Sequence, residues 1–143
     1  MTPIYLYYGS ASPIEGEFIF PKKGADAKSR SANLHVAVYA FDSKEIAIAV
    51  ALVKCKGVKG SSIRFSQNPP AVVYEGWPDQ EDIYLYTLSL EKFLQTSMKK
   101  QWMSLVPVKP LKTEKLNVAN YTHLIKRASE DEKTEWLKII LHH

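Results

Sequence analysis

Only one cysteine, Cys55, occurs among the 143 residues of the chain. A single thiol excludes an internal disulfide and a cysteine-rich metal site. It is also typical of proteins from a reducing compartment, so we expect a cytoplasmic protein. Histidines at the paired spacing of a metal site are missing as well, because His35 and His123 lie far apart in the sequence. The sequence therefore predicts no metal site.

Long apolar runs are absent too. No stretch approaches the roughly 18 apolar residues that mark a membrane-spanning helix. The first residues, MTPIYLYYGS, lack the basic start and the apolar core of a secretory signal. We therefore expect a protein without a membrane partner.

The common sequence motifs for nucleotide, phosphate and metal chemistry are also missing. The chain contains no GxGxxG, no GxxxxGK(S/T) and no HExxH. It lacks the GxSxG elbow of α/β-hydrolases as well. Any activity must therefore rest on a pattern that is weaker than these motifs.

The composition itself is typical of one folded domain. The length is that of an ordinary domain. A content of 45% hydrophobic and 24% charged residues is the composition of a folded, soluble protein. We therefore expect residues 1–143 to form a single domain.

The charge is mildly basic, with a net value of +4 and an isoelectric point near 9.1. Two segments concentrate the basic residues, one with Lys22, Lys23, Lys28 and Arg30, the other with Lys54, Lys56, Lys59 and Arg64. Such runs are usually solvated loops. The alternative is an anion site for a phosphate or a nucleic-acid backbone.

The first half of the chain predicts two strands and a buried helix. Residues typical of strands occupy Ile4–Tyr8 and Leu34–Phe41. The irregular stretch Gly9–Asn33 between them is long enough for a binding or lid segment, with an idle insertion as the alternative. A helix follows the second strand, with Asp42 as its N-cap and Glu45 in the capping-box position. It is apolar on nearly every side, so we expect it to be buried.

The second half switches to the period of two that is typical of strands. The segments SSIRF, AVVYE and DIYLYTLSL are predicted strands, and LEKFLQTS is a short helical or turn piece. QWMSLVPVKP is a further strand, and Pro107 and Pro110 place its end at a sheet edge.

Two helices are predicted at the end of the chain, one over NYTHLIKRA and one that begins after Ser129, where Glu132 completes a capping box. The order of elements predicts an α+β fold with a mainly antiparallel, split β-sheet rather than alternating βαβ units.

Three short stretches are not explained by a core alone: YYGS at Tyr7–Ser10, VYAFDSKEIAIAVAL at Val38–Leu52, and QWMSLVPVKP at Gln101–Pro110. In this order they resemble the ADP-ribosyltransferase fold, in the branch of diphtheria toxin and the poly(ADP-ribose) polymerases. Small bacterial proteins of that kind share a similar pattern, and the resemblance covers most of the chain. It implies NAD as a substrate and an unidentified protein or nucleic-acid acceptor.

The resemblance assigns a role to each matching residue. Gly9 matches the glycine whose backbone pairs with the nicotinamide carboxamide, and Ser10 adds a hydroxyl to the same cradle. Tyr39 matches the tyrosine that stacks on the nicotinamide ring. Tyr8 stands where the family has a histidine that holds the adenosine ribose, and Gln101 stands at the position of the catalytic glutamate.

The last two residues depart from the family pattern. A glutamate stabilises the cation-like ribose of this reaction, whereas Gln101 can donate and accept hydrogen bonds but carries no charge. Losing such an electrostatic contribution costs about 3–4 kcal/mol in comparable sites. Other carboxylates on or near the later strands are Glu75, Glu81 and Glu91. Arg30 in the long basic loop is our candidate for the pyrophosphate, because a guanidinium binds phosphate oxygens with two hydrogen bonds.

Three functions follow as hypotheses. The first is a NAD-binding protein of ADP-ribosyltransferase type that transfers ADP-ribose to a macromolecule. The second is a catalytically degenerate binding or interaction protein on the same fold. The third is a basic nucleic-acid-binding module, which ranks last because the net charge is only +4.

Overall fold

A computed structural model of the chain describes residues 3–23 and 36–141, so the predicted pyrophosphate residue Arg30 lies outside the described residues. Two mostly antiparallel sheets and two α-helices make up this part of the chain. The expected α+β class is therefore confirmed.

The larger sheet has seven strands and contains the N-terminal strand near its middle. Its strand order is β7-β8-β3-β1-β6-β9, and β2 pairs with β3 outside this row. The strands are β1 (Tyr5–Ser10), β2 (Lys22–Lys23), β3 (Val36–Phe41), β6 (Asp82–Ser89), β7 (Leu94–Gln95), β8 (Gln101–Ser104) and β9 (Lys112–Asn117).

The smaller sheet has three strands in the order β10-β5-β4, namely β10 (Ile125–Arg127), β5 (Ala71–Gly76) and β4 (Val58–Ile63). The strands β4 and β5 are antiparallel, whereas β5 and β10 run parallel. The parallel pair of β5 and β10 therefore attaches the C-terminal part of the chain to the small sheet.

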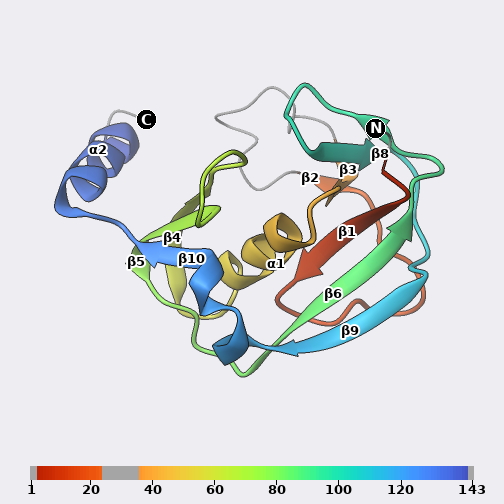
Figure 1. Ribbon diagram of the computed structural model, residues 1–143, viewed down its shortest axis with the longest axis horizontal. Helices are drawn as coiled ribbons and strands as arrows, with labels where there is room; N and C mark the ends of the chain where they lie inside the picture. The colour runs from red at the N-terminus through yellow and green to blue at the C-terminus, as the bar shows by residue number, and fades with distance from the viewer. Residues whose placement is uncertain (1–2, 24–35, 142–143) are drawn as a thin grey trace.

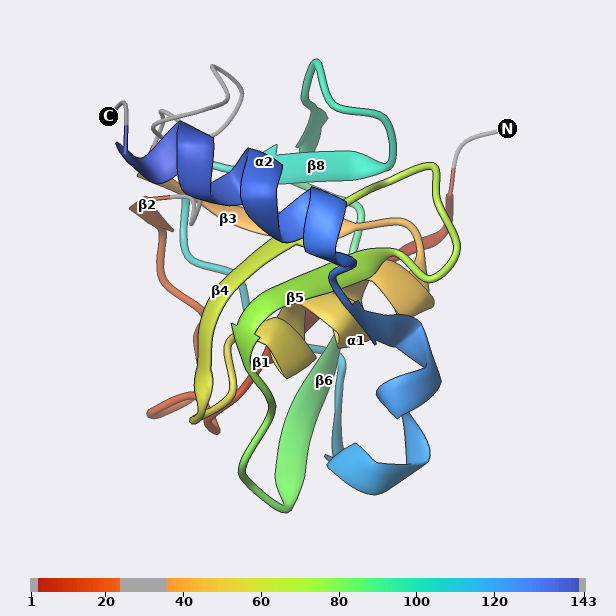
Figure 2. The same ribbon diagram turned by 90° about the vertical axis from the view of Figure 1, so that its left-hand side faces the viewer.

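Helix α1 (Lys44–Val53) lies between the two sheets, as Figures 1 and 2 show from two sides. Its buried residues are Ile46, Ala47, Ile48, Ala49, Ala51 and Leu52. They form the first core together with residues of both sheets and of the C-terminal segment, namely Phe41, Cys55, Ala71, Val73, Ile83, Leu85, Val118, Leu124 and Ile125. Burial on nearly every side, as the sequence predicts, follows from this central position.

The opposite face of the large sheet carries a second core, formed by Leu6, Tyr8, Ile19, Val38, Ala40, Tyr86, Leu88, Phe93 and Val108. Two loop segments close over this face. The backbones of Ile19 and Val108 exchange two hydrogen bonds of 2.8 and 3.0 Å. The Ile14 N–H donates to the Tyr86 hydroxyl at 2.9 Å. The large sheet is therefore covered on both faces.

Helix α2 (Glu130–Leu141) lies outside the small sheet and has no buried residue (Figure 2). The predicted capping box is present. Ser129 N–H donates to Glu132 Oε1 at 3.0 Å, and Glu132 N–H donates to Ser129 Oγ at 3.1 Å. The boundary of this helix was therefore readable from local sequence.

One side chain joins three separate segments near the end of β1. The Gln80 amide nitrogen donates to the carbonyls of Ala11 and Asp82, both at 2.7 Å, and its oxygen accepts from the Lys56 N–H at 2.9 Å. The segment after β1, the start of β6 and the link from α1 to β4 thus share one amide.

Two predicted boundaries in the first half are wrong. The first strand does not end at Tyr8 but continues through Gly9 and Ser10, because both residues pair with β6. The N-cap of α1 is Ser43, whose hydroxyl accepts from the Ile46 N–H at 3.3 Å. Asp42 instead accepts from the Trp102 indole N–H at 3.1 Å.

Of the two predicted C-terminal helices, the first is wrong, whereas the second is α2. NYTHLIKRA begins at the last residue of the 3₁₀ turn η2 (Val118–Asn120) and contains the 3₁₀ turn η3 (Thr122–Leu124) and strand β10. The sequence prediction omitted β9. LEKFLQTS contains β7, and β7 rather than β8 lies at the edge of the sheet. In each case pairing with a distant strand decided the local structure.

Candidate functional site

The three stretches that carry the family resemblance lie side by side in the large sheet. Strand β3 with Tyr39 lies between β8 with Gln101 and β1 with Gly9. Four consecutive pairs join β3 to β8, from Val38–Ser104 to Phe41–Gln101. In contrast, β1 and β3 share the single pair Tyr7–Phe41. The described parts of the two strands have no further ladder pair beyond it.

The side chains of the predicted site divide between the two faces of the sheet. Successive residues of a strand point to opposite faces, and Val38 and Ala40 belong to the second core. Tyr39 therefore points to the face on which α1 packs. Gln101 shares that face because it pairs with Phe41, a residue of the first core. Tyr8 belongs to the second core and points to the other face.

Gly9 has a packing reason to be glycine. A Cβ atom at this position would fall on the carbonyl oxygen of Ala47 in α1, and Ala51 lies next to it. The backbone of β1 can therefore lie this close to α1 only because position 9 has no side chain. The neighbour Ser10 makes a local turn, since its hydroxyl donates to the Ser12 carbonyl at 2.6 Å.

Tyr8 is packed rather than open to solvent. Its side chain is only 7% exposed, and its ring lies 6.1 Å from the Tyr86 ring. The ammonium of Lys22 lies 5.8 Å from the centre of the Tyr8 ring, within reach of a cation–π interaction. Lys22, which belongs to the first basic segment of the sequence, therefore lies over the Tyr8 ring.

Gln101 is the first residue of β8 and is buried in the hairpin that β7 and β8 form. It is 3% exposed, and its side-chain oxygen accepts from the Thr96 hydroxyl at 2.8 Å. The Thr96 N–H also donates to the Gln101 carbonyl at 3.1 Å. The side chain therefore helps to hold the hairpin closed.

A carboxylate that sequence reasoning missed lies on β9. Glu114 pairs with Leu85, and Leu85 pairs with Gly9, so the three residues form one row across the sheet. Glu114 Oε1 is buried without a hydrogen-bond partner among the described residues, with Lys112 Nζ at 3.7 Å. The sequence did not indicate strand β9, because KTEKLN has too few apolar residues to predict a strand.

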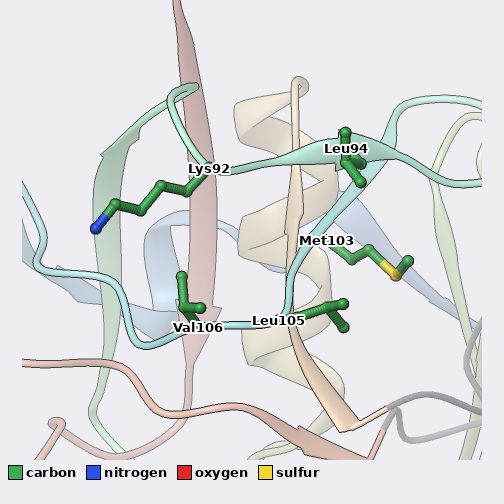
Figure 3. Close-up of a pocket in the computed structure, with 5 residues that line it drawn as sticks. All are labelled: Lys92, Leu94, Met103, Leu105 and Val106. Atoms are coloured by element: carbon green, nitrogen blue, oxygen red, sulfur yellow. The ribbon is translucent and has the colours of Figure 1, made fainter.

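A second feature that sequence reasoning missed is an open hollow of about 430 Å³ beside the β7–β8 hairpin. Its lining, drawn in Figure 3, consists of Lys92, Leu94, Met103, Leu105 and Val106. Met103 pairs with Leu94 on one side and with Tyr39 on the other. The hollow therefore adjoins the predicted site on the same face of the sheet. We call it the apolar hollow.

The turn before β7 and the turn between β7 and β8 each hold one lysine in a strained backbone conformation. Lys92 has φ 78° and Lys100 has φ 69°, and within residues 3–23 and 36–141 they are the two non-glycine residues with positive φ. Such conformations cost about 1–3 kcal/mol and are concentrated at functional sites.

The remaining reactive groups do not form a second site. Burial raises the pKa of the Cys55 thiol to about 11, so the thiol stays protonated at neutral pH and is a poor nucleophile. In the described part of the chain, His, Cys, Asp and Glu side chains form no group of three that could hold a metal ion. The described helices include none that is long and apolar enough to cross a membrane.

Comparison with known proteins adds no relative. No family model matches the chain, and neither a curated protein nor a solved structure matches it. The function must therefore be argued from the residues and their arrangement.

Proposed function

We propose that the protein binds NAD in the manner of an ADP-ribosyltransferase, at the junction of β1, β3 and β8. The observation that carries this proposal is the strand order β8-β3-β1. It brings the three stretches with the family resemblance together although they are separated in the sequence. Helix α1 follows β3 directly, as that resemblance implies.

The short ladder between β1 and β3 supports a ligand at this junction. Beyond the pair Tyr7–Phe41, the described parts of the two strands share no further ladder pair, while Val36 and Ala37 of β3 pair with β2. Strand backbone N–H and C=O groups suit the carboxamide of nicotinamide, which has one acceptor and two donors like other primary amides. Tyr39, half-buried on β3, would supply the ring for stacking.

The residues fit nicotinamide recognition better than they fit transfer. When bound, NAD would supply the ADP-ribosyl group and its nicotinamide leaving group. Stabilising the resulting cation-like ribose requires a nearby carboxylate. Gln101 is neutral, buried and bound to Thr96. The packing of Tyr8 beneath Lys22 likewise restricts its contact with an adenosine ribose.

Isothermal titration calorimetry with NAD and with nicotinamide tests the proposal. We expect both ligands to bind, and Tyr39→Ala to weaken nicotinamide binding by about two- to tenfold, because aromatic stacking contributes about 0.5–1.5 kcal/mol. Tyr5→Ala is the matched control, since Tyr5 is 47% exposed at the start of β1 and lies outside the junction. Absence of heat with either ligand at millimolar concentration would show that the proposal is wrong.

A second candidate function is NAD binding without turnover, and the environment of Gln101 favours it. Under this proposal the wild-type protein transfers no label from radioactive NAD, whereas Gln101→Glu raises NAD cleavage by restoring a carboxylate. Gln95→Glu, on the exposed strand β7, controls for added charge nearby. Brisk cleavage of NAD by the wild-type protein would contradict this candidate while leaving NAD binding intact.

A further inference from the structure

The apolar hollow has the chemical character of a docking surface. Three of its lining side chains are unusually exposed for aliphatic residues, with Leu94 at 66%, Leu105 at 60% and Val106 at 44%. Figure 3 shows Lys92 and Leu94 on one chain segment and Leu105 and Val106 on the segment that faces it. Contiguous exposed apolar surface of this kind commonly marks an interaction site.

The stretch of chain that lines the hollow is basic, although the acidic Glu91 directly precedes it and Asp42 lies against Trp102 of β8. Residues 92–113 contain no acidic residue but include Lys92, Lys99, Lys100, Lys109 and Lys112. Lys109 pairs with Glu17 and Lys112 with Glu114, each at 3.7 Å. Lys92, Lys99 and Lys100 form no ion pair with any other described residue. Among residues 3–23 and 36–141 these three lysines therefore have no ionic partner, and Lys92 lines the apolar hollow.

Two turns with a strained backbone hold Lys92 and Lys100. Phe93 N–H donates to the Leu90 carbonyl at 3.0 Å, and Gln101 N–H donates to the Met98 carbonyl at 3.3 Å. Each hydrogen bond closes a four-residue turn whose third residue is a lysine with positive φ. Glycine would adopt this conformation without strain, yet lysine occupies both positions.

We propose that the apolar hollow and Lys92, Lys99 and Lys100 bind a protein partner that carries an exposed aliphatic side chain within an acidic segment. The aliphatic side chain enters the hollow between Leu94, Met103 and Leu105. The carboxylates of the segment pair with the lysines, which gives specificity and faster association. This interaction is independent of the proposed NAD site, although Met103 adjoins Tyr39.

The lining favours a protein over a nucleic acid or a membrane. Proteins that bind single strands stack the bases on aromatic rings, whereas the residues that line the hollow are aliphatic apart from Lys92. A membrane-binding surface inserts protruding apolar side chains into lipid, whereas this surface is concave and can receive a side chain from a partner.

Fluorescence anisotropy tests the proposal with a labelled synthetic peptide in which one leucine is flanked on both sides by aspartate and glutamate. We expect saturable binding that weakens as salt rises. Replacing the peptide leucine by alanine should weaken binding at least tenfold. The double variant Lys92→Glu with Lys99→Glu should also weaken binding at least tenfold.

The matched control is Lys56→Glu with Lys59→Glu, which changes the net charge equally at two exposed lysines outside the hairpin. It should retain most of the affinity, and circular dichroism establishes that both variants fold. No saturable binding at millimolar peptide, or equal binding by the leucine and alanine peptides, would overturn the proposal. Tighter binding of oligothymidylate or of phosphatidylserine vesicles, lost in the same hairpin variant, would assign another class of partner and overturn it as well.

Discussion

The two α-helices have similar N-terminal caps but are held by different forces. Ser43 caps α1 and Ser129 caps α2, each through its hydroxyl. Helix α1 buries six residues between the two sheets, whereas α2 buries none. The stability of α1 thus depends on packing in the interior, and that of α2 on a few polar and aromatic contacts at the surface.

An aromatic stack and two ion pairs attach α2 to the rest of the described chain. The Trp136 ring stacks on the Tyr74 ring of β5 at 5.3 Å between centres and 4° between planes. Gly60 on β4 leaves room for this ring, because a Cβ atom there would meet it. Glu132 pairs with Arg64 at 2.9 Å and with Lys126 at 3.4 Å. Helix α2 therefore contributes no residue to either core, and we expect it to detach while both cores remain intact.

The largest loss of stability should come from Gly9→Ala, which disrupts the packing of β1 against α1. The added methyl group would meet the Ala47 carbonyl, so the helix or β1 must shift, at a cost of about 3 kcal/mol. Urea denaturation would measure this loss. Gly16→Ala is the control, because Gly16 has φ 76° and open space around it, and it should cost only about 1 kcal/mol. Equal losses in the two variants would show that contact with α1 does not require glycine at position 9.

Trp136→Ala should have a smaller and local effect. Losing the stack on Tyr74 removes about 1 kcal/mol, so amide hydrogen exchange should accelerate in α2 while α1 and β6 keep their protection. Leu137→Ala, at a position that is 46% exposed, should change exchange little. Acceleration throughout the chain after Trp136→Ala would show that α2 unfolds together with both cores.

The smallest effect should be a pH dependence of α2 docking. The Ser129 backbone N–H, helped by the Ser129 hydroxyl and the Lys126 ammonium, lowers the pKa of Glu132 to about 2 from an ordinary value of 4.5. This stabilisation is complete above pH 4.5 and is lost as pH falls from about 4.5 to about 2. Hydrogen exchange in α2 should follow that window. Glu132→Gln should abolish the dependence, while Glu135→Gln, at an exposed residue of the same helix, should preserve it.

Local chemistry explains which elements could be predicted from the sequence. The alternation in DIYLYTLSL and the box formed by Ser129 and Glu132 need no distant partner, and both predictions are confirmed. The residues of β10, Ile125–Arg127, look helical locally but form a strand because the edge of β5 accepts them. Asp42 and Ser43 are both good caps, and the indole of Trp102, 60 positions away, decides between them.

The candidate site was predictable only as a set of neighbouring strands. The order of the three resembling stretches suggested that Gly9, Tyr39 and Gln101 would lie together, and the sheet order places their strands side by side. The face of each side chain depends on register, because a shift of one residue reverses it. Register depends in turn on pairs such as Phe41 with Gln101, which no local pattern specifies. The apolar hollow forms between β7 and the chain after β8, so it has no signature in either segment alone.

The amide of Gln80 connects three parts of the protein by hydrogen bonds. It has one oxygen and two N–H groups, and all of them are used, toward Lys56, Ala11 and Asp82. A ligand that displaced the segment after β1 would have to break the bond to Ala11 or move the amide. Moving the amide would transmit the displacement to the start of β6 and to the connection that leads into the small sheet. The Gln80 side chain is therefore a hydrogen-bonded link between the large sheet and the connection from α1 to β4.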